Sequence, residues 1–172
     1  MNDLRSASCC FTGHRQIPRS LFPVLQRFLE ESLSALIARG VTNFLAGGAL
    51  GFDTLAAETV LRFRERHPQI RLALILPCKD QEKGWSAENA LRYRRILALA
   101  DEVSYVTEQY AAGCMHKRNR RLVQNSAVCV CYLEKTSGGT FYTVNYAKEQ
   151  GLELFCFPPD EAAQLKLGDL GL

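Results

Sequence analysis

The sequence lacks long hydrophobic runs. Its longest apolar segments, such as Leu72–Leu76, have the length of buried strands and fall well short of the roughly 20 residues that a membrane helix needs. The first residues, Met1–Arg5, also lack the basic region and long apolar stretch of a secretory signal peptide. We therefore expect a cytoplasmic protein that does not associate with membranes.

Internal repeats and low-complexity segments are absent as well. The chain has 172 residues, of which 47% are hydrophobic and 23% charged, and this is an ordinary composition for one soluble domain with a sizeable core. We expect a single domain over residues 1–157, followed by a C-terminal tail over residues 158–172 that begins at Pro158-Pro159.

Cysteine is present, but not in the pattern of a disulfide framework or a metal site. Five of the seven cysteines lie in apolar runs that read as buried strands, where a thiol behaves as a small hydrophobic group. Cys129 and Cys131 alternate along one such run and should share a face. Structural zinc sites use a wider spacing and a second pair of ligands, so we predict core packing and no metal.

Strong charge of one sign is missing too. The net charge is +3, which by itself does not indicate a nucleic-acid partner. The basic residues are nevertheless clustered. The clusters are Arg62/Arg64/Arg66, Arg92/Arg94/Arg95 and Lys117/Arg118/Arg120/Arg121. The first two fit solvated helix faces.

Short apolar runs alternate with longer amphipathic stretches along the chain. The predicted strands are Ser8–Thr12, Asn43–Ala46, Leu72–Leu76, Glu102–Val106, Val128–Leu133 and Leu154–Phe157. The predicted helices span about Ser20–Arg39 (with Ser20 as its cap), Asp53–Arg66, Ser86–Ala100, Met115–Gln124 and Gly139–Gln150. This alternation predicts an α/β protein with a doubly wound, mostly parallel sheet and helices on both faces.

Glycines follow three of the predicted strands. These segments are Thr12–Arg15, Gly47–Asp53 and Ser137–Thr140. In a doubly wound sheet the ligand sits at the carboxyl ends of the strands, where glycine lets the backbone approach a phosphate and a helix N-terminus offers free N–H groups. A tight turn explains any one of these loops equally well, but three at one edge predict a phosphate or nucleotide site.

The glycine loops match neither of two common phosphate motifs. Gly47–Gly51 reads Gly-Gly-x-x-Gly, so it fails the dinucleotide fingerprint, and no Gly-Lys-Ser/Thr follows to make a Walker A loop. Arg15 and Arg118 are the best phosphate ligands because a guanidinium fork matches phosphate oxygens. His14 can donate to a phosphate or act as an acid or base. Asp53 can cap its helix, bind ligand hydroxyls or hold a metal, and a helix cap is the favoured role.

Several of these motifs, in their order and spacing, resemble the YpsA-like family of the SLOG superfamily. They are Thr-Gly-His-Arg at 12–15, Gly-Gly-Ala-Leu-Gly-Phe-Asp at 47–53, Pro77 with Gln81 and Trp85, Tyr93, Ala100-Asp101, Arg118-Asn119 and Gly138-Gly139-Thr140. The resemblance covers about residues 8–157 and implies a Rossmann-like fold that binds a nucleotide or an NAD/ADP-ribose-like ligand. The ligand-binding residues it implies are Gly13, His14, Arg15, Gly47, Gly48, Asp53, Gln81, Trp85, Arg118, Asn119, Gly138, Gly139 and Thr140.

Two related groups in the superfamily imply different functions. The LOG-type phosphoribohydrolases cleave nucleoside monophosphates with a glutamate that belongs to the motif Pro-Gly-Gly-x-Gly-Thr-x-x-Glu. The corresponding stretch here, residues 137–143, is shorter and lacks that glutamate, which Asp53 or Glu58 could replace. The DprA-type proteins bind single-stranded DNA, and Lys117–Arg121 with nearby Tyr105 and Tyr110 offers a similar surface, although the modest net charge argues against it. The resemblance also implies helix-mediated homodimers. We expect a nucleotide-binding or sensor protein whose catalytic residues, if any, the sequence does not identify.

Overall fold

The computed structural model describes residues 3–159 and contains a six-stranded, all-parallel sheet with the strand order β4-β3-β2-β1-β5-β6. The strands are β1 Ser8–Gly13, β2 Asn43–Ala46, β3 Arg71–Leu76, β4 Glu102–Tyr105, β5 Val128–Tyr132 and β6 Glu153–Phe157. Each predicted strand is present within one residue of its expected bounds. The predicted tail, apart from Pro158 and Pro159, lies outside the described residues.

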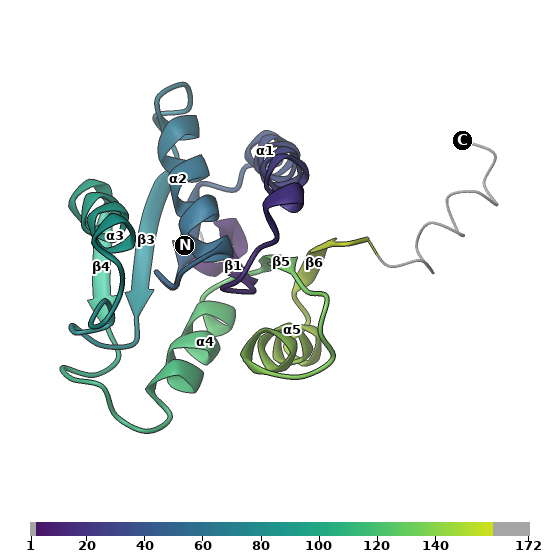
Figure 1. The fold of residues 1–172 in the computed structure, drawn as a ribbon. Helices are drawn as coiled ribbons and strands as arrows, with labels where there is room; N and C mark the ends of the chain where they lie inside the picture. The colour runs from purple at the N-terminus through teal and green to yellow at the C-terminus, as the bar shows by residue number, and fades with distance from the viewer. Residues whose placement is uncertain (1–2, 160–172) are drawn as a thin grey trace.

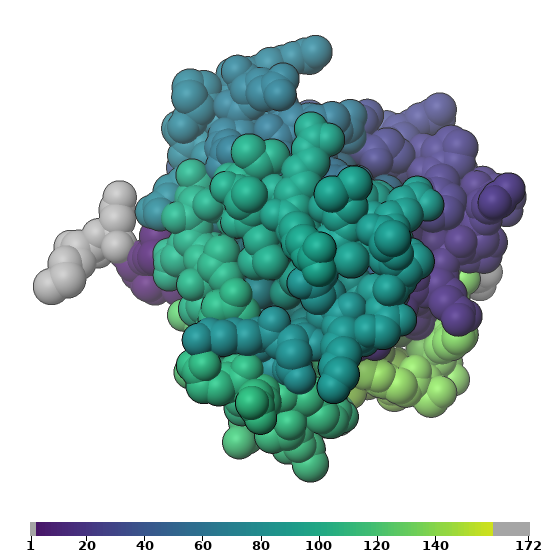
Figure 2. Space-filling view, turned by 60° about the vertical axis from the view of Figure 1, so that its left-hand side comes forward, coloured from purple at the N-terminus to yellow at the C-terminus, as the bar shows by residue number. Residues whose placement is uncertain are grey.

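Five α-helices cover the two faces of the sheet (Figure 1). They are α1 Phe22–Ala38, α2 Phe52–Arg64, α3 Ala87–Leu99, α4 Cys114–Gln124 and α5 Gly139–Glu149. Helices α1, α2 and α3 lie on one face and α4 and α5 on the other, so the predicted doubly wound α/β architecture is confirmed. The space-filling view shows the end of the molecule where α3 and the edge strand β4 lie (Figure 2).

The core has two layers because side chains alternate along each strand. In β1, Cys9 and Phe11 pack toward α1, α2 and α3, whereas Cys10 packs toward α4 and α5. Cys129 and Cys131 of β5 share the Cys10 layer, as their spacing predicts. These thiols act as small apolar groups in the sheet.

The start of α1 differs from the prediction. We expected Ser20 to cap this helix, but residues Arg19–Leu21 form a short 3-10 turn (η2) and α1 begins at Phe22. Ser20 thus lies inside the turn, two residues before the helix, and no side chain caps α1. A serine does cap α3: Ser86 Oγ accepts the backbone N–H of Asn89 at 3.2 Å at the start of this helix.

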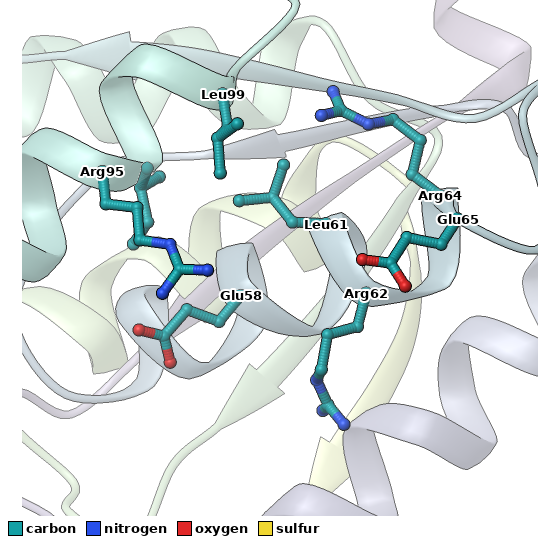
Figure 3. Close-up of a pocket in the computed structure, with 8 residues that line it drawn as sticks. Glu58, Leu61, Arg62, Arg64, Glu65, Arg95 and Leu99 are labelled. Carbon is teal, nitrogen blue, oxygen red and sulfur yellow. The ribbon is translucent and has the colours of Figure 1, made fainter.

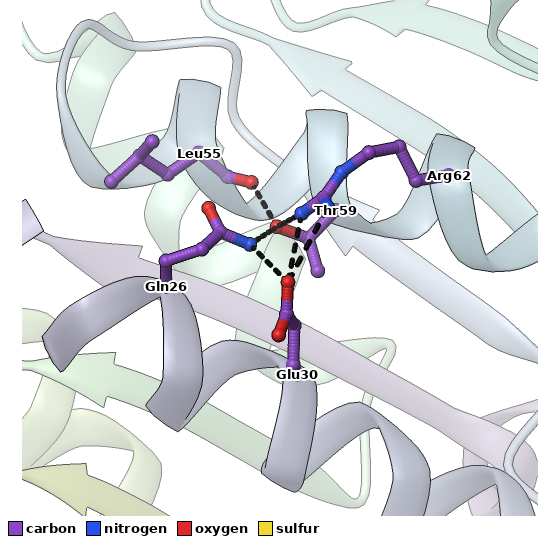
Figure 4. Close-up of polar contacts among 5 residues, drawn as sticks. All are labelled: Gln26, Glu30, Leu55, Thr59 and Arg62. Carbon is purple, nitrogen blue, oxygen red and sulfur yellow. Dashed lines mark hydrogen bonds and ion pairs between the residues drawn. The ribbon is translucent and has the colours of Figure 1, made fainter. Parts of the chain in front are cut away.

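A polar network joins α1 to α2 above the sheet (Figure 4). The Gln26 amide donates to Glu30 and to the Thr59 hydroxyl, each at 3.1 Å, and Arg62 Nη2 lies 3.3 Å from Glu30. The hydroxyl of the fully buried Thr59 donates to the Leu55 carbonyl at 2.6 Å. This network links α1 to α2, whose first turn borders the site described below.

The chain order places a switch point between β1 and β5. Strands β1 to β4 follow one another to one side, and β5 then returns to pair with the other side of β1. The loops after β1 and β5 therefore leave the sheet in opposite directions and open a crevice, which is where ligands bind in such sheets. Within residues 3–159, no helix combines the length and the apolar character needed to cross a bilayer.

Candidate functional site

A cavity of about 350 Å³ lies at this switch point, and we call it the switch-point cavity. It is lined by Phe11, Thr12, Gly13, His14, Arg15, Ala49, Asp53, Met115, Arg118, Asn119, Lys135, Ser137, Gly138, Gly139 and Thr140. These residues come from the end of β1, from the loops after β1, β2 and β5, and from the N-terminal parts of α2, α4 and α5. Three of the charged lining residues are basic and one is acidic, so the cavity favours an anion.

Arg118 forms part of the cavity floor. Its side chain is buried, at 5% exposure, and donates from Nε to Asn119 Oδ1 at 2.7 Å and from Nη1 to the carbonyl of Gly47. Burial lowers the pKa of the guanidinium, and the nearby charge of Asp53 opposes that shift. A Cβ at position 47 would collide with this guanidinium, so Gly47 is required by the close approach of Arg118.

Asp53 is the carboxylate of the switch-point cavity. It is 5% exposed, and its Oδ2 accepts the backbone N–H of Ala49 at 3.2 Å. Burial raises the pKa of this carboxyl, while Arg118, the Ala49 N–H and Arg15 oppose the shift. The predicted role as a helix cap is wrong: Gly51 occupies the cap position of α2, and Asp53 holds the loop before it.

His14 holds two loops together at the cavity wall. Its Nε2 accepts the backbone N–H of Glu134 at 2.9 Å and lies 3.4 Å from that of Lys135. Its ring also meets Tyr132 edge-on, with the centroids 5.1 Å apart. Burial, and then the charge of Lys135, lower the pKa of the imidazole. A neutral ring that accepts at Nε2 suits loop anchoring better than proton donation to a ligand from that atom.

The N-terminus of α5 is uncapped and faces open space in the switch-point cavity. Gly138 adopts φ +92° and ψ −175° at the cap position, and no side chain caps the helix or places a negative charge in its first turn. A Cβ at Gly138 or Gly139 would have no neighbouring atom within 4 Å, so both glycines face open space. The first N–H groups of α5 and the helix dipole can therefore receive an anion.

The structure brings nine of the thirteen predicted site residues into the switch-point cavity lining and leaves four outside it. Gly47 and Gly48 lie behind the cavity wall, with Gly48 against Leu76 and Tyr93. Trp85 packs edge-on against Tyr93, with the ring centroids 5.2 Å apart. Gln81 is 8% exposed, and neither amide atom has a hydrogen-bond partner among the described residues.

Sequence reasoning missed Lys135 and Ser137 as lining residues. Both belong to the β5–α5 loop, and Ser137 was noted only as part of the glycine motif. A stronger signal was available, since a lysine two residues before a Ser-Gly-Gly turn at a strand end adds charge to a phosphate loop. Among residues 3–159, no group of three His, Cys, Asp or Glu side chains is arranged to hold a metal ion.

A second cavity, of about 400 Å³, lies between α2 and α3 (Figure 3). It is lined by Glu58, Leu61, Arg62, Arg64, Glu65, Arg95, Ile96 and Leu99. Glu58, a predicted substitute for the hydrolase glutamate, pairs here with Arg92 at 2.8 Å. Arg64 pairs with Asp101 at 2.7 Å. This cavity borders the C-terminal halves of both helices, away from the carboxyl ends of the strands, so Glu58 does not reach the switch-point cavity.

Comparison with known proteins agrees with this fold. The chain is 32% identical over 151 residues to the SPbeta prophage-derived protein YoqJ of Bacillus subtilis, covering 77% of this chain and 88% of that protein. It is 35% identical over 129 residues to a UPF0398 protein of Halalkalibacterium halodurans, covering 73% and 68%.

Solved structures of DNA processing protein A share the fold at low sequence identity. The Helicobacter pylori protein, described for its single-stranded DNA binding mode, has a TM-score of 0.65 at 19% identity and covers 98% of this chain and 74% of that one. The Streptococcus pneumoniae protein has a TM-score of 0.66 at 16% identity, covering 92% and 52%. The family model of the YspA SLOG family (YpsA) matches residues 10–154, and the chain therefore belongs to this family.

Proposed function

We propose that this protein binds a nucleotide-type ligand through its phosphate groups in the switch-point cavity. The observation that carries the proposal is the open N-terminus of α5 facing the same cavity as Arg15, Arg118 and Lys135. Backbone N–H groups at a helix start and guanidinium groups are well suited to bind phosphate in proteins. Their convergence at a switch point supports a phosphate ligand.

The remaining lining groups suit the sugar of a nucleotide. The Asp53 carboxylate can accept hydrogen bonds from a ligand, and the Asn119 amide can both accept and donate them. Ser137 and Thr140 add hydroxyl groups to the cavity lining. The cavity volume of about 350 Å³ falls within the range of about 300–1,000 Å³ found for small-molecule sites. AMP, NAD and ADP-ribose are the ligand types that this combination favours, in a sensor or regulatory role.

Ligand binding is tested best by calorimetry on wild type and two arginine variants. Arg15 is exposed and lines the cavity, so Arg15→Ala removes a phosphate donor without opening the core. Loss of one charge-assisted hydrogen bond should weaken binding of AMP, NAD or ADP-ribose by about 10-fold to 100-fold. Arg19→Ala is the matched control because Arg19 is exposed and lies outside the cavity lining.

Two outcomes would contradict the proposal. Either none of the three ligands binds wild type at millimolar concentration, or Arg15→Ala and Arg19→Ala bind equally well. Turnover is a separate question, answered by looking for free base after incubation with nucleoside monophosphates. Asp53 is the carboxylate that lines the cavity, so base release that survives Asp53→Asn would exclude it as the catalytic group.

Single-stranded nucleic acid is a second candidate partner, favoured by one surface strip beside the cavity. The Arg120 guanidinium lies over the Tyr146 ring at 5.0 Å, and the Tyr142 and Tyr146 rings are parallel within 2°. Stacking rings next to cations are typical of single-strand binding, and the similar Helicobacter pylori protein is described as binding single-stranded DNA.

Oligonucleotide anisotropy at two salt concentrations tests this second candidate. Arg120→Ala should weaken binding and flatten its salt dependence, because each phosphate contact releases counterions. Arg95 is an exposed arginine on α3, so Arg95→Ala should leave both the affinity and its salt dependence unchanged. Equal effects of the two substitutions would remove the case for this strip.

A further inference from the structure

The side chains of Cys131 and Cys156 form a pair of thiols on adjacent strands that the proposed function does not use. The two residues are direct neighbours in the parallel register of β5 and β6. Their Sγ atoms lie 2.9 Å apart. Neighbouring strands are about 4.8 Å apart, which is within the Cα separation of about 4.4–6.8 Å that a disulfide spans. A bond between them therefore needs no rearrangement of the sheet.

The two thiols differ in access. Strand β6 is the edge of the sheet, and Cys156 on it is partly exposed, whereas Cys131 on the inner strand β5 is fully buried. A small oxidant can reach the outer thiol first, and the inner thiol is already in contact to resolve the product. Reactive cysteine pairs with one exposed and one resolving thiol have this arrangement.

The surroundings of Cys131 favour its reaction. Hydrogen bonds donated by the Cys129 and Cys156 thiols lower the pKa of Cys131. The lowered pKa favours the thiolate of Cys131, which is the form that attacks the oxidised Cys156 sulfur in the resolving step. Cys10 and Cys129 are also neighbours in register, on β1 and β5, but both are buried in the interior of the sheet and lack the exposed partner.

We propose that Cys131 and Cys156 form a reversible disulfide when the protein meets a peroxide. In the first step Cys156 Sγ attacks a peroxide oxygen, the O–O bond breaks, and a sulfenic acid and one water form. In the second step Cys131 Sγ attacks the Cys156 sulfur, the S–O bond breaks, and the hydroxyl leaves with the remaining thiol proton as water. Two thiols are oxidised and one peroxide is reduced to two waters.

The bond would join the edge strand to β5 one residue before Tyr132. The Tyr132 hydroxyl donates to Glu134 Oε2 at 2.9 Å, and its ring contacts His14. Oxidation would thus fasten the strand that leads into the β5–α5 loop. Formation of this disulfide does not require a nucleotide in the switch-point cavity.

Peptide mapping of the full chain after mild hydrogen peroxide treatment tests the proposal. We expect two fewer reactive thiols, a mass loss of about 2 Da, and a cross-linked peptide pair containing Cys131 and Cys156 that dithiothreitol releases. Cys156→Ser should abolish the cross-link. Cys9→Ala, which changes a cysteine on the opposite face of the sheet, should retain it.

Wild-type mapping decides the question even if a variant folds poorly. A cross-link between Cys10 and Cys129, or accumulation of sulfinic acid at Cys156 with all other cysteines still reactive, would overturn the proposal. Persistence of all seven thiols under conditions that oxidise a control dithiol peptide would overturn it as well.

Discussion

His14 Nε2 accepts the backbone N–H of Glu134 at 2.9 Å, and this bond ties the loop after β1 to the loop after β5. The two loops are the walls of the switch-point cavity, and 120 residues separate them in the chain. Only a neutral imidazole can accept at Nε2. The geometry of the cavity wall is therefore coupled to the protonation of one side chain.

Acidification should destabilise the protein through His14. Its pKa in the folded state is below the ordinary value of 6.5, so the unfolded chain binds a proton more readily than the folded one. Stability is then fully present above pH 6.5 and is lost as pH falls below that value toward the folded pKa. Urea unfolding of wild type should show this loss as the pH is lowered through the ordinary histidine value of 6.5 and below it.

The matched variant is His14→Gln, whose amide oxygen can accept a hydrogen bond but does not titrate. It should show a flatter pH dependence over the same interval. Asp80, Asp101 and Glu153, whose pKa values are lowered in the fold, act at more acidic pH and are common to both proteins. Parallel curves for wild type and His14→Gln would contradict the assignment.

Removing the buried Arg118 should cost far more stability than removing an exposed arginine of the same helix. Arg118→Ala leaves the Gly47 carbonyl and Asp53 without their charged partner. We expect the free energy of unfolding to fall by about 3 kcal/mol, measured by urea denaturation. Arg121→Ala on exposed α4 surface should change it by no more than about 0.5 kcal/mol.

Gly138 and Gly139 form a matched pair for testing the backbone at the start of α5. At φ +92° and ψ −175°, Gly138 occupies a region that is essentially restricted to glycine, so Gly138→Ala should cost about 1–3 kcal/mol. Gly139 is helical and faces open space, so Gly139→Ala should be close to neutral for stability. Thermal unfolding of both variants checks this. Equal losses would show that the backbone at 138 is not the constraint.

The network between α1 and α2 can be tested at Thr59, which is fully buried. Thr59→Val keeps the volume but removes the hydroxyl that accepts from Gln26 and donates to Leu55. Stability should fall by about 1–2 kcal/mol in denaturant titrations. Thr59→Ser keeps the hydroxyl and loses only a methyl group. A larger loss for serine than for valine would mean that packing matters more than the network here.

The sequence predicted the strands and helices well because their signals are local. Each strand is a short apolar run with both faces covered, and the glycine at 138 and the serine at 86 mark helix starts by their own chemistry. The start of α1 was predicted wrongly because serine is a residue type that often caps helices. In the structure Ser20 lies in the 3-10 turn formed by Arg19–Leu21, and α1 begins after that turn.

The site residues were harder to assign. The spacing predicted that the loops after β1, β2 and β5 meet at one sheet edge, but it did not distinguish residues that face the cavity from those behind it. Gly47 was predicted as part of a phosphate cradle, yet it lies outside the cavity lining, and its carbonyl accepts from Arg118. Trp85 was predicted as a ligand-binding residue, yet it lies outside the cavity lining and packs on Tyr93. The same residue type can contact a ligand or pack behind the cavity wall, so the sequence pattern alone does not distinguish these two roles.

The sequence by itself determined the parallel, doubly wound architecture, because hydrophobic periodicity and the lengths of the connections leave few other topologies. Only the tertiary structure decided which polar groups share one cavity, that His14 anchors a loop, and that Cys131 and Cys156 are neighbours. These relationships join residues from 25 to 120 positions apart. They depend on strand order and register, which many packed side chains decide together.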